Sequence, residues 1–94
     1  MATQIDPVWT IEEACEVADL RRAIQYQAQQ ILELARRLRR SPVRGVAGPM
    51  AAYSLETAAK DTARAAWHIA EQSGRAEDQV AEHMRALSQF GEGG

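Results

Sequence analysis

Residues 17–38 read VADLRRAIQYQAQQILELARRL, and their apolar positions recur at alternating steps of three and four residues. These positions are Val17, Leu20, Ile24, Ile31, Leu34 and Leu38, and the polar Gln27 occupies the one remaining position of the same spacing. We call these seven positions the heptad seam. Such a pattern is typical of a helix that packs lengthwise against another helix. The stretch therefore predicts a long helix that needs a helical partner, and it carries no catalytic motif.

Local signals on either side set the bounds of this first helix. Thr10 followed by Glu13 has the spacing of a capping box, and Asp6-Pro7 offers an alternative start. Ser41-Pro42 ends the helix, because the residue before a proline disfavours helical backbone angles. We expect an N-terminal arm over residues 1–9 and a first helix over about 10–40.

The rest of the chain predicts two more helices. Gly48 and Pro49 close a loop and favour the start of a second helix, which we expect over about 49–73 with Gly74 as its terminator. A short third helix should cover about 76–89, and residues 91–94 should form a flexible tail. The expected fold is all-α, a single domain over 10–90 built on a long antiparallel helical hairpin.

The second helix has two adjacent stripes of small or apolar residues. They are Ala51, Leu55, Ala58, Thr62, Ala65 and Ile69 in the first, and Ala52, Ala59, Ala63, Ala66 and Ala70 in the second. The alanines predict close helix packing. The third helix is expected to act as a lid, because its apolar residues align on one face, namely Ala76, Val80, Met84, Leu87 and Phe90. The first helix has a second apolar side that another element must cover, formed by Ile11, Ala14, Cys15 and Ala18.

The expected length of the first helix predicts that this chain has a partner. A helix over 10–40 would span roughly 45 Å, whereas a compact globule of 94 residues is only about 32 Å across. The fold should therefore be elongated, and a lone hairpin has a thin core. We expect a homodimer that forms a four-helix-type bundle, or a complex with another helical protein.

Composition excludes few classes of function. The net charge of −2 does not indicate a nucleic-acid or membrane partner, and charged residues interrupt the alanine-rich segment over residues 47–70, so no membrane span is expected. A single cysteine, Cys15, cannot form an internal disulfide, which favours a cytoplasmic location. The abundance of alanine and arginine, with Lys60 as the only lysine, is typical of a bacterium with a high-GC genome.

Five arginines near the end of the first helix form the most functional-looking cluster, Arg36, Arg37, Arg39, Arg40 and Arg44. They could hold the phosphates of an anion or a nucleic acid, which makes a nucleic-acid-associated regulatory protein the first alternative function. They could also complement the helix dipole or pair with carboxylates, for example Glu33 with Arg37. No helix-turn-helix or zinc-finger spacing accompanies them.

Gln27 and Trp67 are candidate interface residues beside the apolar positions of the heptad seam. Gln27 could hydrogen-bond to its counterpart across a two-fold axis, or it could reach solvent. Trp67 could anchor an interface, or its ring could cap the rim of the core. The sequence leaves these alternatives open.

Neither catalysis nor metal binding has a motif here. His68 and His83 lack the Glu-x-x-His spacing of di-iron bundles, so we expect no metal and no cofactor. We expect His83 to be a packed core histidine and Cys15 a small buried side chain. A small helical-bundle enzyme with a pocket at a dimer interface is the second alternative. The function that the sequence favours is a non-catalytic, self-associating protein–protein interaction or assembly module.

Overall fold

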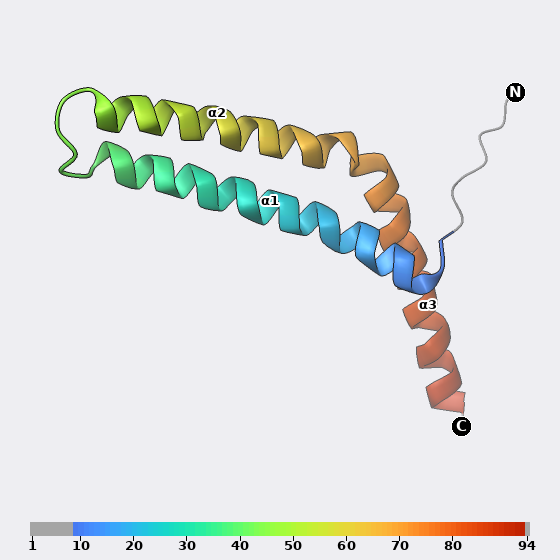
Figure 1. Cartoon of the computed structure of the whole chain (residues 1–94). Helices are drawn as coiled ribbons and strands as arrows, with labels where there is room; N and C mark the ends of the chain where they lie inside the picture. The colour runs from blue at the N-terminus through green and yellow to red at the C-terminus, as the bar shows by residue number, and fades with distance from the viewer. Residues whose placement is uncertain (1–8, 94) are drawn as a thin grey trace, which may run out of the picture.

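The computed structural model describes residues 9–93, with side chains as far as Phe90, and these residues form three α-helices (Figure 1). Helix α1 spans Ile11–Arg39, α2 spans Ala47–His68 and α3 spans Ala70–Gly93. Helices α1 and α2 lie side by side as an antiparallel hairpin, and α3 leaves the end of α2 at an angle and passes the start of α1. No strand occurs within residues 9–93, so the predicted all-α class is confirmed for that range.

The capping box at the start of α1 is confirmed. The Thr10 hydroxyl accepts a hydrogen bond of 3.1 Å from the Glu13 amide, and the Glu13 carboxylate accepts one of 2.9 Å from the Thr10 amide. This reciprocal pair satisfies two amides that the first helical turn leaves without partners. The alternative start at Asp6-Pro7, and the arm apart from Trp9, lie outside the described residues.

A short loop joins α1 to α2. The Ser41 hydroxyl donates to the Leu38 carbonyl at 2.8 Å and accepts from the Val43 amide at 3.3 Å, which ends α1 close to the predicted residue. Gly45 has a φ of 72°, a left-handed conformation that favours glycine. Helix α2 then begins at Ala47, two residues before the predicted start.

The boundary between the second and third helices differs from the prediction. Helix α2 ends at His68 instead of residue 73, and Gly74 lies inside α3 without terminating any helix. Helix α3 has 24 residues against 22 in α2, so the prediction of a short third helix is wrong, and it continues through Gly93 into the expected tail. A glycine inside a helix costs only about 1 kcal/mol, which the packing of its neighbours Ser73 and Ala76 can offset.

Alanine forms the interior of this fold. The buried apolar residues are Ala14, Ala18, Ala28, Ala35, Ala52, Ala59, Ala66 and Ala76. Three of them come from the second predicted stripe of α2, in which Ala63 is exposed and Ala70 is half-buried. Because a methyl group is the whole side chain at these positions, α1 and α2 can approach closely, but each contact removes little apolar surface from water.

Helix α3 covers Ala14 and Ala18 on the second side of α1, as predicted, and leaves Cys15 exposed. Ala76 of α3 packs against Ala14 and Ala18 of α1, and Trp9 and Val80 lie at the edge of this cluster. The Gln79 side-chain amide donates to the Trp9 carbonyl at 2.7 Å, which ties the residue before the capping box to α3. The kink after His68 is what brings these residues together.

The molecule is a single layer of helices. Its extents are 66 × 41 × 14 Å and its radius of gyration is 19.8 Å, against about 12 Å for a compact chain of this length. The expected elongated shape is therefore confirmed. Most domains bury their apolar surface between two or three layers of secondary structure, whereas here both faces of the hairpin stay open.

Candidate protein interface

The buried alanines divide the hairpin into two faces. A residue just before a buried alanine lies about 100° to one side of the contact between α1 and α2, and a residue just after it lies about 100° to the other side. Leu34 precedes Ala35 on α1, and Ala58 precedes Ala59 on α2. Because the two helices are antiparallel, the preceding residues of both helices share one side of the layer.

We call that side the apolar face. It consists of the heptad seam of α1 and the first stripe of α2, namely Ala51, Leu55, Ala58, Thr62, Ala65 and Ile69. None of these positions carries a charge. The two helices contribute to one continuous surface, since Leu34, Leu38 and Leu55 line the same hollow together with Arg37 and Ser41.

Much of the heptad seam remains accessible to solvent. Leu20 and Leu34 are each 47% exposed, and Gln27 is exposed as well. Val17, Ile24, Ile31 and Leu38 are half-buried, because α2 or α3 covers only one flank of the seam. The contact between α1 and α2 therefore centres on the alanines, and the seam lies along its edge. The dimer contact expected of the seam stays a prediction.

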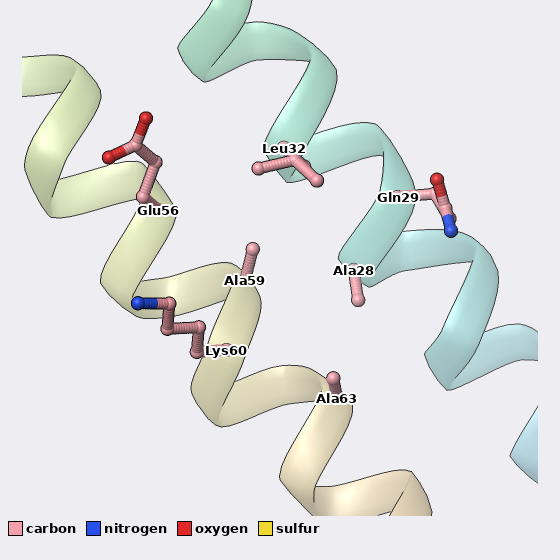
Figure 2. A pocket seen from close by; sticks show the side chains of 7 residues that line it. All are labelled: Ala28, Gln29, Leu32, Glu56, Ala59, Lys60 and Ala63. Atoms are coloured by element: carbon pink, nitrogen blue, oxygen red, sulfur yellow. The ribbon is translucent and has the colours of Figure 1, made fainter.

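The opposite side of the hairpin, which we call the polar face, carries a shallow groove (Figure 2). The groove has a volume of about 400 Å³ and is lined by Ala28, Gln29, Leu32, Glu56, Ala59, Lys60 and Ala63. Alanine methyl groups form much of its wall, and Lys60 and Glu56 supply its charges. No nucleophile with an adjacent base lines it, and no cluster of three or more His, Cys, Asp or Glu with metal-binding geometry occurs among the described residues.

Trp67 belongs to the polar face and does not join the heptad seam. It follows Ala63 by four residues and Lys60 by seven, both of which line the groove just described. Its ring is 73% exposed and meets the ring of His68 edge to face, with centroids 5.3 Å apart. The ring therefore does not cap the core, and as an interface residue it would serve a surface separate from the seam.

Three arginines of the cluster contact carboxylates in the structure. Arg39 donates two hydrogen bonds of 2.9 Å to the carboxylate of Glu56, and this bond lowers the pKa of Glu56 below its ordinary value. Arg36 and Arg40 approach the Glu33 carboxylate at 3.6 and 3.9 Å, so Glu33 pairs with these two and not with Arg37. Arginines already held by carboxylates have less to offer a phosphate.

Arg37 lies apart from the other arginines of α1. It lines the hollow that Leu34, Leu38 and Leu55 form on the apolar face, and no ion pair joins it to another described residue. With Arg36, Arg39 and Arg40 engaged by carboxylates and Arg37 beside the apolar hollow, the cluster does not offer five unengaged guanidinium groups to a phosphate. The sequence could not reveal the pairing of Arg39 with Glu56, since these two residues belong to different helices.

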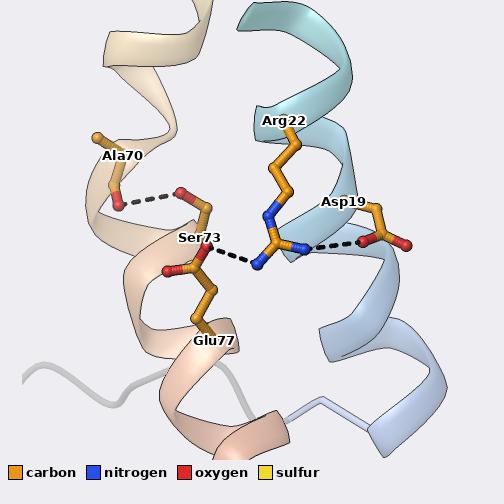
Figure 3. A network of polar contacts seen from close by, with 5 residues as sticks. All are labelled: Asp19, Arg22, Ala70, Ser73 and Glu77. Atoms are coloured by element: carbon orange, nitrogen blue, oxygen red, sulfur yellow. Dashed lines mark hydrogen bonds and ion pairs between the residues drawn. The ribbon is translucent and has the colours of Figure 1, made fainter. Parts of the chain in front are cut away.

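A further polar network joins α1 to α3 (Figure 3). The Arg22 guanidinium lies 3.9 Å from the Asp19 carboxylate of its own helix and 3.7 Å from the Glu77 carboxylate of α3. Ser73 is fully buried beside this network, and its hydroxyl donates to the Ala70 carbonyl at 3.1 Å. No buried side-chain nitrogen or oxygen atom of the described residues lacks a hydrogen-bond partner, so this network leaves no vacant buried group.

Several side chains expected in the core are exposed instead. His83, Met84, Leu87 and Phe90 are exposed because α3 runs beyond the start of α1, where no other described element reaches them. The prediction of a core histidine is therefore wrong, and α3 acts as a lid only through Ala76 and Val80, which pack against α1. Cys15 is also exposed, in a shallow hollow that it lines together with Glu77 and Val80 of α3.

Comparisons of the sequence and the fold with known proteins identify no relative. The chain matches no family model, no curated protein and no solved structure. None of the helices within residues 9–93 combines the length and the apolar character needed to cross a lipid bilayer. The apolar face, whose seam and stripe positions carry no charge, is therefore the feature from which a function can be argued.

Proposed function

We propose that this protein is a self-associating assembly module, in which the apolar faces of two copies pack together as a four-helix bundle. The observation that carries the proposal is that Leu20 and Leu34 stay half exposed in a row of uncharged seam positions, with charged residues such as Glu16 and Arg37 at its edges. A second hairpin on this face would supply the second layer that the monomer lacks. The function is then binding and assembly, without a catalytic step.

The free energy available from this contact is substantial for so small a chain. Covering the exposed part of each leucine contributes roughly 1–2 kcal/mol, at about 25 cal/mol per Å² of apolar surface. A symmetric dimer covers each leucine twice, once from each copy. The half-buried isoleucines of the seam add to this, and the alanines of α2 allow the second pair of helices to approach closely.

Light scattering after size exclusion tests the proposal directly. The expected mass at micromolar concentration is twice the 10.4 kDa of one chain. Leu34→Glu places a charge on the apolar face, at a position the monomer itself leaves half exposed, so this variant should be a helical monomer. Tyr26→Glu is the matched control, because Tyr26 is 61% exposed away from the heptad seam, and it should remain a dimer.

A wild-type chain that stays monomeric at these concentrations would contradict the proposal. Circular dichroism of both variants guards against a trivial result, since a Leu34→Glu chain that loses its helices reports on folding and not on association. In that case Leu20→Glu, at an equally exposed position, repeats the measurement.

The other two functions that the sequence leaves open have less support. A nucleic-acid partner would need the arginines on one surface, whereas Arg36, Arg39 and Arg40 already contact carboxylates. An enzyme would need a pocket with convergent polar groups. In the groove of Figure 2 the polar residues are Gln29, Lys60 and Glu56, and Glu56 is already hydrogen-bonded to Arg39. Measuring DNA and RNA binding against salt concentration checks the first of these.

A further inference from the structure

We infer that the two copies pack antiparallel, with the hairpin tip of each copy over the open end of the other and a two-fold axis crossing the apolar face at Gln27. This inference rests on the proposed self-association and adds its direction and register. The alternative is a dimer with both tips at the same end, in which α1 would lie over α2 of the second copy.

The heptad seam is nearly symmetric about Gln27. Counted from Gln27, Ile24 is three residues before and Ile31 four after, and Leu20 and Leu34 are each seven residues away. Val17 and Leu38 lie ten and eleven residues away. An isologous interface requires that residue i meets residue j and that j meets i, and an axis at Gln27 satisfies this along the whole seam.

The stripe on α2 is symmetric about the same level of the hairpin. Its members lie two, five and nine residues on either side of position 60. Ala28 on α1 lines the same groove as Ala59, Lys60 and Ala63, so Gln27 and position 60 lie at one height along the layer (Figure 2). A single axis across the hairpin therefore serves both helices.

The antiparallel register also pairs side chains of complementary size on α2. Leu55 of one copy meets Ala65 of the other, and Ala51 meets Ile69. A large side chain opposite a small one fills the space between two helices without overpacking.

Gln27 itself favours the antiparallel arrangement. At the two-fold axis, two Gln27 carboxamides face one another, and each can donate to the other. In the alternative, Gln27 would face the alanines of α2, where the hydroxyl of Thr62 already donates to the Ala58 carbonyl at 2.8 Å. A buried amide that lacks partners is costly, so the reciprocal pair is the better arrangement.

The distribution of charge along the molecule also favours antiparallel packing, because the tip is basic and the open end is acidic. Residues 33–56, around the tip, hold five arginines and two glutamates. Residues 11–22 and 70–90, at the open end, hold eight carboxylates and four arginines. Antiparallel packing puts the basic tip against the acidic end of the partner, whereas the alternative puts two basic tips together.

One specific ion pair follows from this register. Glu16 lies eleven residues before Gln27 and Arg37 lies ten residues after it, so the axis brings them together between the two copies. Both flank the heptad seam, and neither forms an ion pair with another described residue of its own chain. The symmetric dimer would contain this pair twice.

Disulfide cross-linking tests the register. In a Cys15→Ser background, Gln27→Cys should link into a covalent dimer under mild oxidation, because only residues at the axis meet their own counterparts. Leu34→Cys and Leu20→Cys should each fail to link alone, since two copies of residue 34 would lie about 21 Å apart along the helix. The double variant Leu20→Cys/Leu34→Cys should link efficiently.

The outcomes separate this inference from the proposed function. A monomeric mass for the wild-type chain contradicts both. A dimeric mass with no linkage at Gln27→Cys, or with equal linkage of Leu34→Cys alone, overturns the antiparallel register and leaves self-association standing. The mass of each unoxidised variant is measured first, so that a variant that fails to fold is recognised.

Charge reversal gives a second, independent test. Glu16→Arg alone and Arg37→Glu alone should each raise the dimer dissociation constant, on the order of tenfold for two exposed pairs. The double variant restores both pairs and should return close to the wild-type constant. Additive weakening in the double variant would contradict the predicted contact.

Discussion

Two glycines illustrate opposite demands of the backbone at single residues. Gly74 lies inside α3, and a methyl group there would meet no atom within 4 Å. Gly45 has a φ of 72°, where any other residue is strained. The same substitution should therefore have opposite effects at the two positions.

Gly74→Ala should raise the free energy of unfolding by about 0.5–1 kcal/mol, because alanine loses less entropy in a helix than glycine. Gly45→Ala should lower it by about 1 kcal/mol or more, because of its left-handed backbone. Urea denaturation followed by circular dichroism measures both. If Gly74 ended a helix as its sequence context suggests, both variants would be destabilised.

The Arg39–Glu56 pair makes stability depend on pH. Its hydrogen bond lowers the pKa of Glu56 in the folded chain, so the unfolded chain takes up a proton first as the pH falls. The contribution is therefore complete above the unfolded pKa of the carboxyl group, and it is lost as the pH falls through the lower, folded value.

Glu56→Gln should accordingly melt at a slightly lower temperature than the wild type at pH 7, with a small difference because the pair is exposed. The difference should shrink as the pH falls through the lowered pKa of Glu56 and vanish once that carboxyl group is protonated in the folded chain as well. Thermal melts of both chains from pH 7 downward provide the measurement. A difference that persists unchanged in acid would show that the pair does not stabilise the fold through its charge.

At the scale of elements, the contact between α1 and α2 depends on the size of alanine. Ala35 is fully buried where the two helices meet, and Ala23 is exposed elsewhere on α1. Ala35→Leu should lower the free energy of unfolding by about 1–3 kcal/mol, because the helices must separate to admit it. Ala23→Leu should stay within about 0.5 kcal/mol of the wild type, and an equal loss at both sites would contradict close packing.

At the scale of the whole molecule, a one-layer fold ties stability to association. If two copies form the bundle, the melting temperature should rise with protein concentration, because the dimer is favoured by mass action. The Leu34→Glu monomer should show a lower and concentration-independent value. Melts over about a hundredfold range of concentration decide this, and a flat wild-type profile would argue against an obligate pair.

The seam also predicts two severe substitutions. Ile24→Asp and Ile31→Asp place a charge where the side chain is half-buried in the monomer and covered in the proposed dimer. Each should unfold the chain or split the dimer, with a loss of several kcal/mol. A wild-type mass and melting temperature for either variant would show that the seam is not a contact surface.

The sequence by itself determined the helices of this protein wherever local chemistry decides them. The capping box at Thr10, the stop at Ser41-Pro42 and the periodicity of the heptad seam gave the bounds of α1 to within about a residue, because caps and helical spacing act between near neighbours. The same periodicity identified the α1 half of the apolar face.

Only the tertiary structure decided how these helices meet. It placed the kink after His68 instead of at Gly74, because packing of α3 on α1 offsets the modest cost of a glycine in a helix. In the folded chain the alanines are buried and the larger seam residues remain accessible to solvent. Arg39 pairs with a carboxylate on another helix. These outcomes depend on contacts between residues distant in the chain, which no local pattern encodes.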